Sequence, residues 1–291
     1  MLAIGIVVIA GAVIWIAGAG ALLLLIAGLV GATFVLSAAF GCERQPGTQL
    51  DPAGRAMLWL GELAAAWSVF LFWMPLERWC MQRDFAGARV GETPVLLIHG
   101  YINNAGSMWR LWQALRNRGV DVHTLNLEPV YADIEAYVPL IESRVKAICA
   151  LTGADRVTLV CHSMGGLAAR AYLRHCQRTG LDAALCKVVT LGTPHHGTAL
   201  ARFEWSANGR QMVPGNPWLE RLGADERGAW PCPMVSIYSL DDNVVVPQRT
   251  AHLDGARNVE VAGIGHISLP LSRRVIELVL PEVEGPSRTG P

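Results

Sequence analysis

Hydrophobic residues dominate the start of the chain, where positions 2–41 contain no charged side chain. A helix of this length would measure about 60 Å at 1.5 Å per residue, twice the hydrocarbon thickness of a bilayer. Because a Gly-Ala-Gly cluster at 18–20 lies near the middle of the run, and glycine is a weak helix former, we expect a break there. The pattern then predicts two spans, roughly 2–17 and 21–40, which form a transmembrane hairpin over 1–41.

A cleaved signal peptide is the main alternative for an apolar start. Such a peptide needs a basic first segment and an apolar stretch of about 7 to 15 residues. This chain has no basic residue before Arg44, and its apolar run is much longer. The pattern therefore favours a membrane region that stays attached.

A third apolar stretch, within 56–80, carries a single charged residue in its first twenty positions, Glu62. A carboxylate at the centre of a span is costly unless it faces protein or water. The tryptophans of this stretch, by contrast, suit the headgroup level of a membrane. The stretch is therefore either a third transmembrane helix or an interfacial one.

Positive charges in the flanking loops bear on orientation. Arg44 and Arg55 lie before this stretch or at its start, and Arg78, Arg83 and Arg89 lie at its end or after it. If all three segments span, the larger number on the carboxyl side leans the following residues towards the cytoplasm. An interfacial third segment removes that inference.

Between 91 and 280 the pattern changes to short β-branched runs separated by helical stretches. This alternation predicts β-α-β units, and hence an α/β fold with a mostly parallel sheet flanked by helices. The expected strands are 94–98, 121–127, 156–161, 187–191, 234–238 and 258–261. The expected helices are 107–118, 137–151, 164–178 and 272–280.

Two segments depart from this rhythm. The stretch 198–231 holds three tryptophans among prolines and glycines, and we expect it to form a cap or lid over the sheet. The tail 281–291 is rich in proline, glycine and charge, so we expect it to be disordered.

Composition supports a membrane part and excludes some partners. Hydrophobic residues make up 52% of the chain and charged residues 16%, below the roughly 25% charged of an ordinary soluble domain. The formal net charge is zero and the basic residues are scattered, which argues against a nucleic-acid partner. The seven cysteines are odd in number and show no metal-site spacing, so we expect buried thiols and no bound metal.

Candidate chemistry begins at the turn after the third expected strand. The sequence CHSMGG at 161–166 runs from strand into helix, which is the setting of a nucleophile elbow. The glycines after Ser163 permit the sharp turn, and Cys161 stands where a glycine is usual, which makes the turn tighter. We expect Ser163 to act as a nucleophile.

A serine hydroxyl needs a base, and an imidazole base works best when a carboxylate fixes its tautomer. With elbows of this kind, the order along the chain is serine, acid, histidine. Asp241 and Asp242 follow the fifth expected strand, and His266 follows the sixth. Two adjacent carboxylates cannot both point at one imidazole; we favour Asp242, with Asp241 as the alternative.

Backbone amides are expected to stabilise the oxyanion that forms during attack on a carbonyl. The matching positions are Tyr101, in the loop after the first strand, and Met164, directly after the nucleophile. His99 is expected to hold the first of these loops. His195 and His196 follow the fourth strand, and we interpret them as pocket-wall residues that either contact substrate or pack the loop.

Four motifs in this order resemble the bacterial triacylglycerol lipase and esterase family. They are IHGY at 98–101, HSMGG at 162–166, LGTPHHG at 191–197 and GH at 265–266. Related deacylases that act on glycosylphosphatidylinositol anchors share these motifs. The segments NLEP at 126–129 and QMVPG at 211–215 look like members with an amino-terminal membrane region. The resemblance covers about 94–280.

The resemblance implies an α/β-hydrolase fold, hydrolysis of acyl esters through an acyl-enzyme, no cofactor, and a mobile lid over an apolar pocket. We further expect a lipid or acyl-ester substrate and a multi-pass location in a bacterial inner membrane, and we infer no obligate protein partner. Two other functions stay open. One is an acyltransferase that uses the same acyl-enzyme, and the other is a non-catalytic membrane scaffold or transporter component with a hydrolase-like domain.

Overall fold

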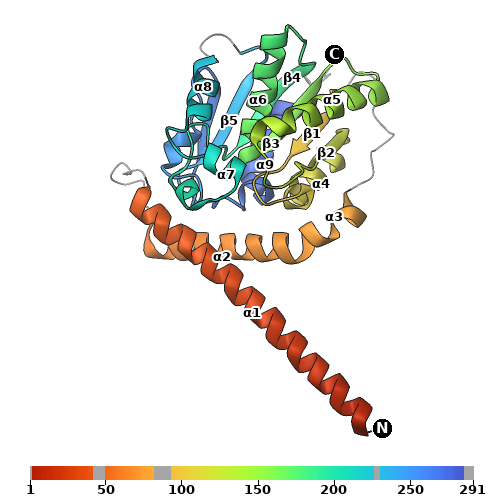
Figure 1. Ribbon diagram of the computed structural model, residues 1–291, viewed down its shortest axis with the longest axis vertical. Coiled ribbons are helices and arrows are strands. Elements are labelled where there is room, and N and C mark those ends of the chain that lie inside the picture. Colours follow the sequence, from red (N-terminus) through yellow and green to blue (C-terminus); the bar gives the residue numbers. More distant parts are fainter. Residues whose placement is uncertain (1, 42–49, 82–92, 226–229, 285–291) are drawn as a thin grey trace, which may run out of the picture.

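The computed structural model describes residues 2–41, 50–81, 93–225 and 230–284, with the side chains of the first helix described from Gly18 onwards. Two apolar helices lie beneath an α/β unit that holds the rest of the described chain (Figure 1).

The amino-terminal run forms one continuous helix, α1 (Leu2–Phe40). The expected break at 18–20, and with it the transmembrane hairpin, is wrong. Glycine costs only about 1 kcal/mol in a helix interior, and the run contains no proline. Nothing local therefore stops the helix. In Figure 1 the first half of α1 runs away from the α/β unit, and its second half crosses α2.

The third apolar stretch is also helical and begins slightly earlier than expected. α2 (Pro52–Ser68) starts after Asp51, whose side chain caps the first turn, and continues through the π-helical turn η1 (Val69–Trp73) into α3 (Met74–Cys80). This helix lies along the underside of the α/β unit (Figure 1). Glu62 is fully buried in that contact, so its carboxylate faces protein rather than lipid.

Two of the described helical segments are long and apolar enough to cross a membrane. They are Gly18–Phe40, with a mean hydropathy of 2.4, and Pro52–Cys80, with a mean hydropathy of 1.5. The most apolar window of the first is 11% buried in the protein and that of the second 33%. Both segments thus leave most of their surface outside the protein interior, and the second packs more extensively on the α/β unit.

Six parallel strands form the sheet, in the order β2-β1-β3-β4-β5-β6. They are β1 (Val95–Ile98), β2 (Val122–Leu125), β3 (Val157–His162), β4 (Leu185–Leu191), β5 (Met234–Ser239) and β6 (Arg257–Val261). Each lies where the sequence predicts a strand. β2 ends earlier than expected because the Leu127 amide donates to the ring of His99 instead of continuing the ladder.

Helices cover both faces of this sheet, so the predicted α/β fold class is confirmed. α4 (Trp109–Asn117) and α9 (Arg273–Val283) pack on one face. α5 (Val138–Thr152) and α6 (Met164–Thr179) pack on the other. Alternate strand residues point to opposite faces, so each layer has a core of its own.

The expected cap at 198–231 contains helices and no strand among its described residues. These helices are η4 (Ala199–Phe203), α7 (Ala207–Gln211) and α8 (Pro217–Asp225). The remaining short turns of 3₁₀-helix are η2 (Ala105–Met108), η3 (Ile134–Tyr137), η5 (Gln248–Ala251) and η6 (Leu269–Leu271).

The carboxyl-terminal tail starts later than predicted. α9 continues through Pro281 to Val283, so the expected disorder from position 281 is wrong for these first residues. Val279, Leu280 and Val283 are buried at helical spacing, and this packing carries the helix past the proline. Positions 285–291 lie outside the described residues.

Candidate active site

Ser163 lies at the sharp turn between β3 and α6. Its backbone has φ 53° and ψ −128°, a conformation that strains any residue with a side chain. The turn is held because Ser163 N donates to Leu191 O at 2.9 Å and the Thr193 hydroxyl donates to Ser163 O at 2.8 Å. A Cβ at Gly165 would collide with carbonyl oxygens at the end of β1. These contacts fix the hydroxyl at the carboxyl edge of the sheet.

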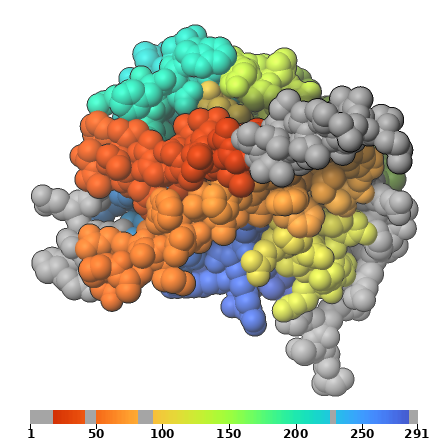
Figure 2. Space-filling view, turned by 90° about the horizontal axis from the view of Figure 1, so that it is seen from below, coloured from red at the N-terminus to blue at the C-terminus, as the bar shows by residue number. Residues whose placement is uncertain are grey.

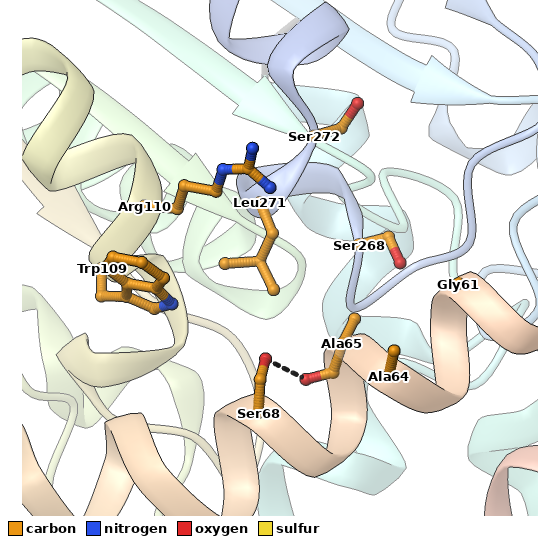
Figure 3. Close-up of a pocket in the computed structure, with 9 residues that line it drawn as sticks. All are labelled: Gly61, Ala64, Ala65, Ser68, Trp109, Arg110, Ser268, Leu271 and Ser272. Carbon is orange, nitrogen blue, oxygen red and sulfur yellow. Dashed lines mark hydrogen bonds between the residues drawn. The ribbon is translucent and has the colours of Figure 1, made fainter.

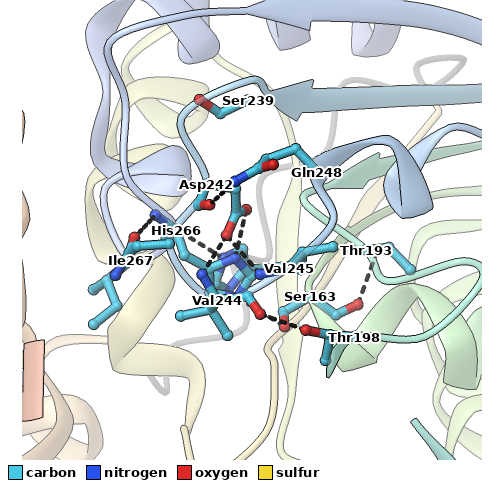
Figure 4. A network of polar contacts seen from close by, with 12 residues as sticks. Ser163, Thr193, Thr198, Ser239, Asp242, Val244, Val245, Gln248, His266 and Ile267 are labelled. Atoms are coloured by element: carbon cyan, nitrogen blue, oxygen red, sulfur yellow. Dashed lines mark hydrogen bonds and ion pairs between the residues drawn. The ribbon is translucent and has the colours of Figure 1, made fainter. Parts of the chain in front are cut away.

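Three side chains that are distant in sequence meet at this turn (Figure 4). Ser163 Oγ lies 2.9 Å from His266 Nε2, and His266 Nδ1 lies 2.8 Å from Asp242 Oδ2. All three side chains are buried. A proton on Nδ1, donated to Asp242, leaves Nε2 free to accept the serine proton. The arrangement is therefore able to activate the hydroxyl.

The two adjacent carboxylates point in different directions. Asp242 Oδ1 accepts from the backbone amides at 244–245, both at 2.8 Å, while its Oδ2 faces His266. Asp241 Oδ2 accepts instead from Gly263 N at 2.8 Å. Asp242 is thus the carboxylate beside the imidazole, and Asp241 anchors the loop that leads to it.

Opposing effects act on the imidazole. Burial lowers the pKa of His266, whereas the charge and hydrogen bond of Asp242, and then the charge of Glu62, raise it. The pKa ends above its ordinary value because the two carboxylates outweigh burial. The site therefore favours the imidazolium that forms when His266 accepts a proton.

Two backbone amides lie beside the serine. Met164 is the first residue of α6, where a helix leaves its amides without a partner inside the helix. Tyr101 follows Gly100, whose backbone packs directly on the serine side chain: a Cβ on Gly100 would lie 2.8 Å from Ser163 Cβ. The residues expected to supply the oxyanion amides thus directly follow Ser163 and a glycine packed on it, and their role as donors stays a prediction.

The side chain of Tyr101 ties its loop to the cap. Its hydroxyl donates to Glu204 Oε2 at 2.7 Å and lies 2.7 Å from Ser206 Oγ. Burial and the bond to Glu204 raise the pKa of Tyr101 to about 12, so the hydroxyl keeps its proton. Tyr131 packs against Tyr101 and also against Trp205 of the cap. The cap thus supports the loop beside the serine.

Two further histidines support the site. His99 Nδ1 donates to Gly100 O at 2.8 Å and its Nε2 accepts from Leu127 N at 3.0 Å, which confirms that His99 holds this loop. Burial lowers the pKa of His99 to about 4, so the ring is neutral. His162 Nε2 donates to His266 O at 3.1 Å, a contact that sequence analysis did not indicate.

The pair of histidines after β4 has other contacts. His195 is buried, with Nε2 3.1 Å from Thr190 Oγ1 and Nδ1 3.3 Å from Arg170 Nη1. The side chain of His196 is exposed, and its amide donates to Thr250 O at 2.9 Å. Protein groups thus occupy both ring nitrogens of His195, and substrate contact by either histidine stays a prediction.

Other reactive groups near the serine are few in the part of the chain that the structure describes. No group of three or more His, Cys, Asp or Glu side chains there is arranged to hold a metal ion. Cys161 lies two residues before the serine, and burial raises the pKa of its thiol. A protonated thiol is a weak nucleophile, so Cys161 does not compete with the hydroxyl of Ser163 as a candidate nucleophile.

A hollow of about 320 Å³ lies between α2 and the segment after His266 (Figure 3). Its lining comes from α2, from the start of α4 and from this segment: Gly61, Ala64, Ala65, Ser68, Trp109, Arg110, Ser268, Leu271 and Ser272. No triad residue belongs to the lining. The α2 wall consists of small residues, which lets the helix approach the loop of His266 closely.

Comparisons with known proteins bear on the fold and on the class of reaction. Residues 94–219 match a family model described as palmitoyl protein thioesterase. Triacylglycerol lipases of Pseudarthrobacter phenanthrenivorans and Burkholderia plantarii are each 30% identical to this chain over 118 residues, or 38% of its length. The match covers 35% and 32% of those proteins, so the chain spans about a third of the length of the curated relatives it matches.

Solved lipases share the fold. Lipase BlEst2 of Bacillus licheniformis in mature form has a TM-score of 0.60 at 17% identity, over 68% of this chain and 97% of the lipase. Lipase B of Aspergillus fumigatus has a TM-score of 0.60 at 20% identity, over 70% of this chain and 56% of the lipase. These likenesses show that the chain has the α/β-hydrolase fold. In sequence, the chain is similar to lipases, esterases and thioesterases through the family model and the two triacylglycerol lipases, each matched over less than half of this chain.

Proposed function

We propose that this chain is a membrane-anchored serine hydrolase that cleaves carboxylic esters, of lipid or acyl type, through an acyl-enzyme on Ser163. The observation that carries the proposal is the continuous hydrogen-bond chain from Asp242 through His266 to Ser163. The similarity to triacylglycerol lipases supports the same class of reaction.

The proposed reaction uses each group of the site once in acylation and again in deacylation. Ser163 Oγ attacks the ester carbonyl while His266 Nε2 takes its proton, and the carbonyl oxygen becomes an oxyanion beside the amides of Tyr101 and Met164. The C–O bond of the ester then breaks, and the imidazolium protonates the leaving alcohol. Water then attacks the acyl carbonyl while His266 Nε2 takes its proton, the bond between the acyl carbon and Ser163 Oγ breaks, and the imidazolium returns the proton to Oγ as the acid leaves.

The apolar helices support membrane anchoring. The Trp67 indole donates to Leu23 O at 3.3 Å, so the two helices are in contact at this point of α1. Residues 2–22 precede that contact and would form a helix of about 32 Å, enough to cross a hydrocarbon core of about 30 Å. We therefore assign the span to the first half of α1.

Helix α2–α3 suits the membrane surface better than a second span. It packs along the α/β unit, and Figure 2 shows it side by side with α1 across one face of the molecule. Large apolar side chains stay exposed on it: Met57, Leu60, Phe70, Phe72, Leu76 and Trp79. With an interfacial α2–α3, the flanking arginines no longer favour the cytoplasmic side.

The pH dependence of the reaction follows from the imidazole. We expect the profile of kcat/KM for a soluble ester to have an acidic limb with a midpoint above about 6.5, the ordinary imidazole value. Only neutral His266 accepts the serine proton, and the carboxylate of Asp242 raises its pKa. Activity should therefore fall as the pH decreases through this raised value. Initial rates at a series of pH values would measure it, and a midpoint below the ordinary value would contradict the geometry.

A fluorophosphonate probe tests the proposed function directly. The full chain, purified in detergent, is treated with the probe, and the modified residue is located by mass spectrometry. We expect modification at Ser163, together with hydrolysis of p-nitrophenyl esters of short and medium chain length. Absence of both labelling and turnover would favour the non-catalytic membrane scaffold or transporter component.

Product analysis identifies which acyl donor the protein uses and whether water or an alcohol accepts the acyl group. The match to a thioesterase family model makes acyl thioesters a second candidate substrate, because an acyl-enzyme forms equally from either. Esters and thioesters with the same acyl chain should therefore be compared side by side. Added alcohols that become acylated in preference to water would identify an acyltransferase.

A further inference from the structure

Helix α2 inserts a buried carboxylate into the loop that carries the triad histidine. Glu62 is fully buried, and both of its oxygens accept hydrogen bonds from that loop. Ile267 N donates to Oε1 at 2.6 Å, and Ser268 donates to Oε2 from its amide at 3.0 Å and from its hydroxyl at 2.6 Å. All three donors lie within two residues of His266.

The loop contacts this carboxylate on both sides of the histidine. A Cβ on Gly265 would collide with the Glu62 side chain, so only glycine allows the approach seen here. His266 is thus flanked by one residue that packs on the carboxylate and by two that bond to it. The helix is in this way part of the wall that determines where the imidazole lies.

Helix α1 holds the same loop from another direction. His266 N donates to Asn243 Oδ1 at 3.0 Å, and Asn243 Nδ2 donates to Thr33 Oγ1 of α1 at 2.7 Å. Ser37 of α1 also donates to the carbonyl oxygen of Asp242 at 3.3 Å. Glu62 therefore bonds to a loop whose position is also restricted by contacts with α1.

Simple packing does not account for a carboxylate here. Burying an ionised group is costly, and apolar residues of similar volume usually pack a helix at least as well. Burial raises the pKa of Glu62, and the hydrogen bonds from Ser268 and Ile267 and the positive charge of His266 oppose that rise. The three donors suit a carboxylate that only accepts, which is its ionised form. A negative charge at this place has a specific use, because His266 becomes positive when it takes the serine proton.

We propose that Glu62 is a positioning residue for His266, which fixes the loop of the triad histidine and stabilises its imidazolium together with Asp242. The proposal rests on the proposed function. Three other titratable groups lie near the imidazole or its loop: Asp242 bonds to it, His162 lies beside it as a neutral, tilted ring, and Asp241 bonds to Gly263. Glu62 is the titratable group that the apolar helices place beside the histidine loop.

Glu62→Gln tests the proposal, with Glu77→Gln as the matched control. Glu77 is a second buried acid of the same helical segment, and it lies 3.4 Å from Asn126 Nδ2, away from the histidine loop. In Glu62→Gln, we expect kcat for a soluble p-nitrophenyl ester to fall about 100-fold with little change in KM, because the imidazole is misplaced. The acidic limb of kcat/KM should move to lower pH because one negative charge is lost. Glu77→Gln should keep the wild-type kcat and the wild-type position of the acidic limb in the pH profile.

Labelling of Ser163 by the fluorophosphonate probe to completion counts the folded sites in each variant. A folded Glu62→Gln variant with wild-type kcat would overturn the proposal, and so would a lower kcat with an unmoved acidic limb, since Glu62 would then only pack. If Glu62→Gln yields no folded protein, Ser268→Ala decides instead. It removes one bond and keeps the charge, so kcat should fall about 5-fold with the limb unmoved; wild-type kcat would overturn the proposal.

The same experiments separate this inference from the proposed function. If the wild type labels at Ser163 but hydrolyses no tested ester, the labelling rate replaces kcat in each comparison, because it needs only an activated serine. Absence of wild-type labelling would overturn the proposed function and this inference together. A normal wild type with a fully active Glu62→Gln variant would overturn the inference alone.

Discussion

Ser163→Ala is expected to lower kcat for a soluble p-nitrophenyl ester by about a million-fold, to the level left by substrate binding and the oxyanion amides. The reason is that no other nucleophile replaces the hydroxyl: Cys161 is buried, and its raised pKa keeps the thiol protonated. Fluorophosphonate labelling should disappear with the same substitution. Steady-state rates and labelling, measured on the full chain in detergent, check both effects.

A second buried serine provides the control for this experiment. Ser236 lies inside β5, where it is buried and its hydroxyl donates to Ala251 O at 2.7 Å rather than to a triad residue. Ser236→Ala should cost about 1 kcal/mol of stability, as the loss of one buried hydrogen bond does, and should leave kcat close to wild type. Hydrolysis by Ser163→Ala within tenfold of this control would refute the acyl-enzyme on Ser163.

The sequence predicted the sheet and the residues at its edge because both depend on local patterns. Most strands have a short apolar run; Ser163 follows β3 directly, and Asp242 and His266 lie in the loops after β5 and β6. Parallel strands bring their carboxyl ends to one edge, so the residues after them were expected to meet. The choice between Asp241 and Asp242 needed the structure, since it depends on which carboxylate bonds to Gly263.

The contacts of the apolar helices were not predictable in the same way. The bond between Glu62 and Ser268 joins residues 206 positions apart, and that between Thr33 and Asn243 spans 210. The spacing of apolar residues along the chain does not predict which distant residues will bond to each other. The only local signal was the presence of a single acid in an apolar stretch, which required a polar partner without naming it. The unbroken α1 was missed because the small local cost of glycine was given too much weight.

These contacts change how the two apolar helices relate to the candidate active site. A helix that only tethers a catalytic domain leaves the active site complete without it, whereas here α1 and α2 both bond to the loops of Asp242 and His266. The two helices thus contact the loops that carry the residues of the candidate active site. Lipid that contacts the exposed face of α2 would meet a helix one side chain away from the triad histidine.

Asp242→Asn is expected to lower kcat/KM by about ten-thousand-fold with little change in overall structure. The amide oxygen would replace Oδ1, which accepts from the backbone amides at 244–245. The amide nitrogen would then face His266 Nδ1 and donate to it, which moves the ring proton to Nε2. An imidazole in that tautomer cannot take the proton of Ser163, so acylation should fail although all three side chains stay in place.

Asp241→Asn is the matched control, because it changes the neighbouring acid in the same loop. Its carboxylate bonds to Gly263 N rather than to the imidazole, so we expect a loss of about tenfold or less, as for one loop hydrogen bond. The pH profile separates the two variants further: the negative charge of Asp242 raises the pKa of His266, so residual activity of Asp242→Asn should have its acidic limb at lower pH. A larger loss in Asp241→Asn than in Asp242→Asn would reverse the assignment of the acid.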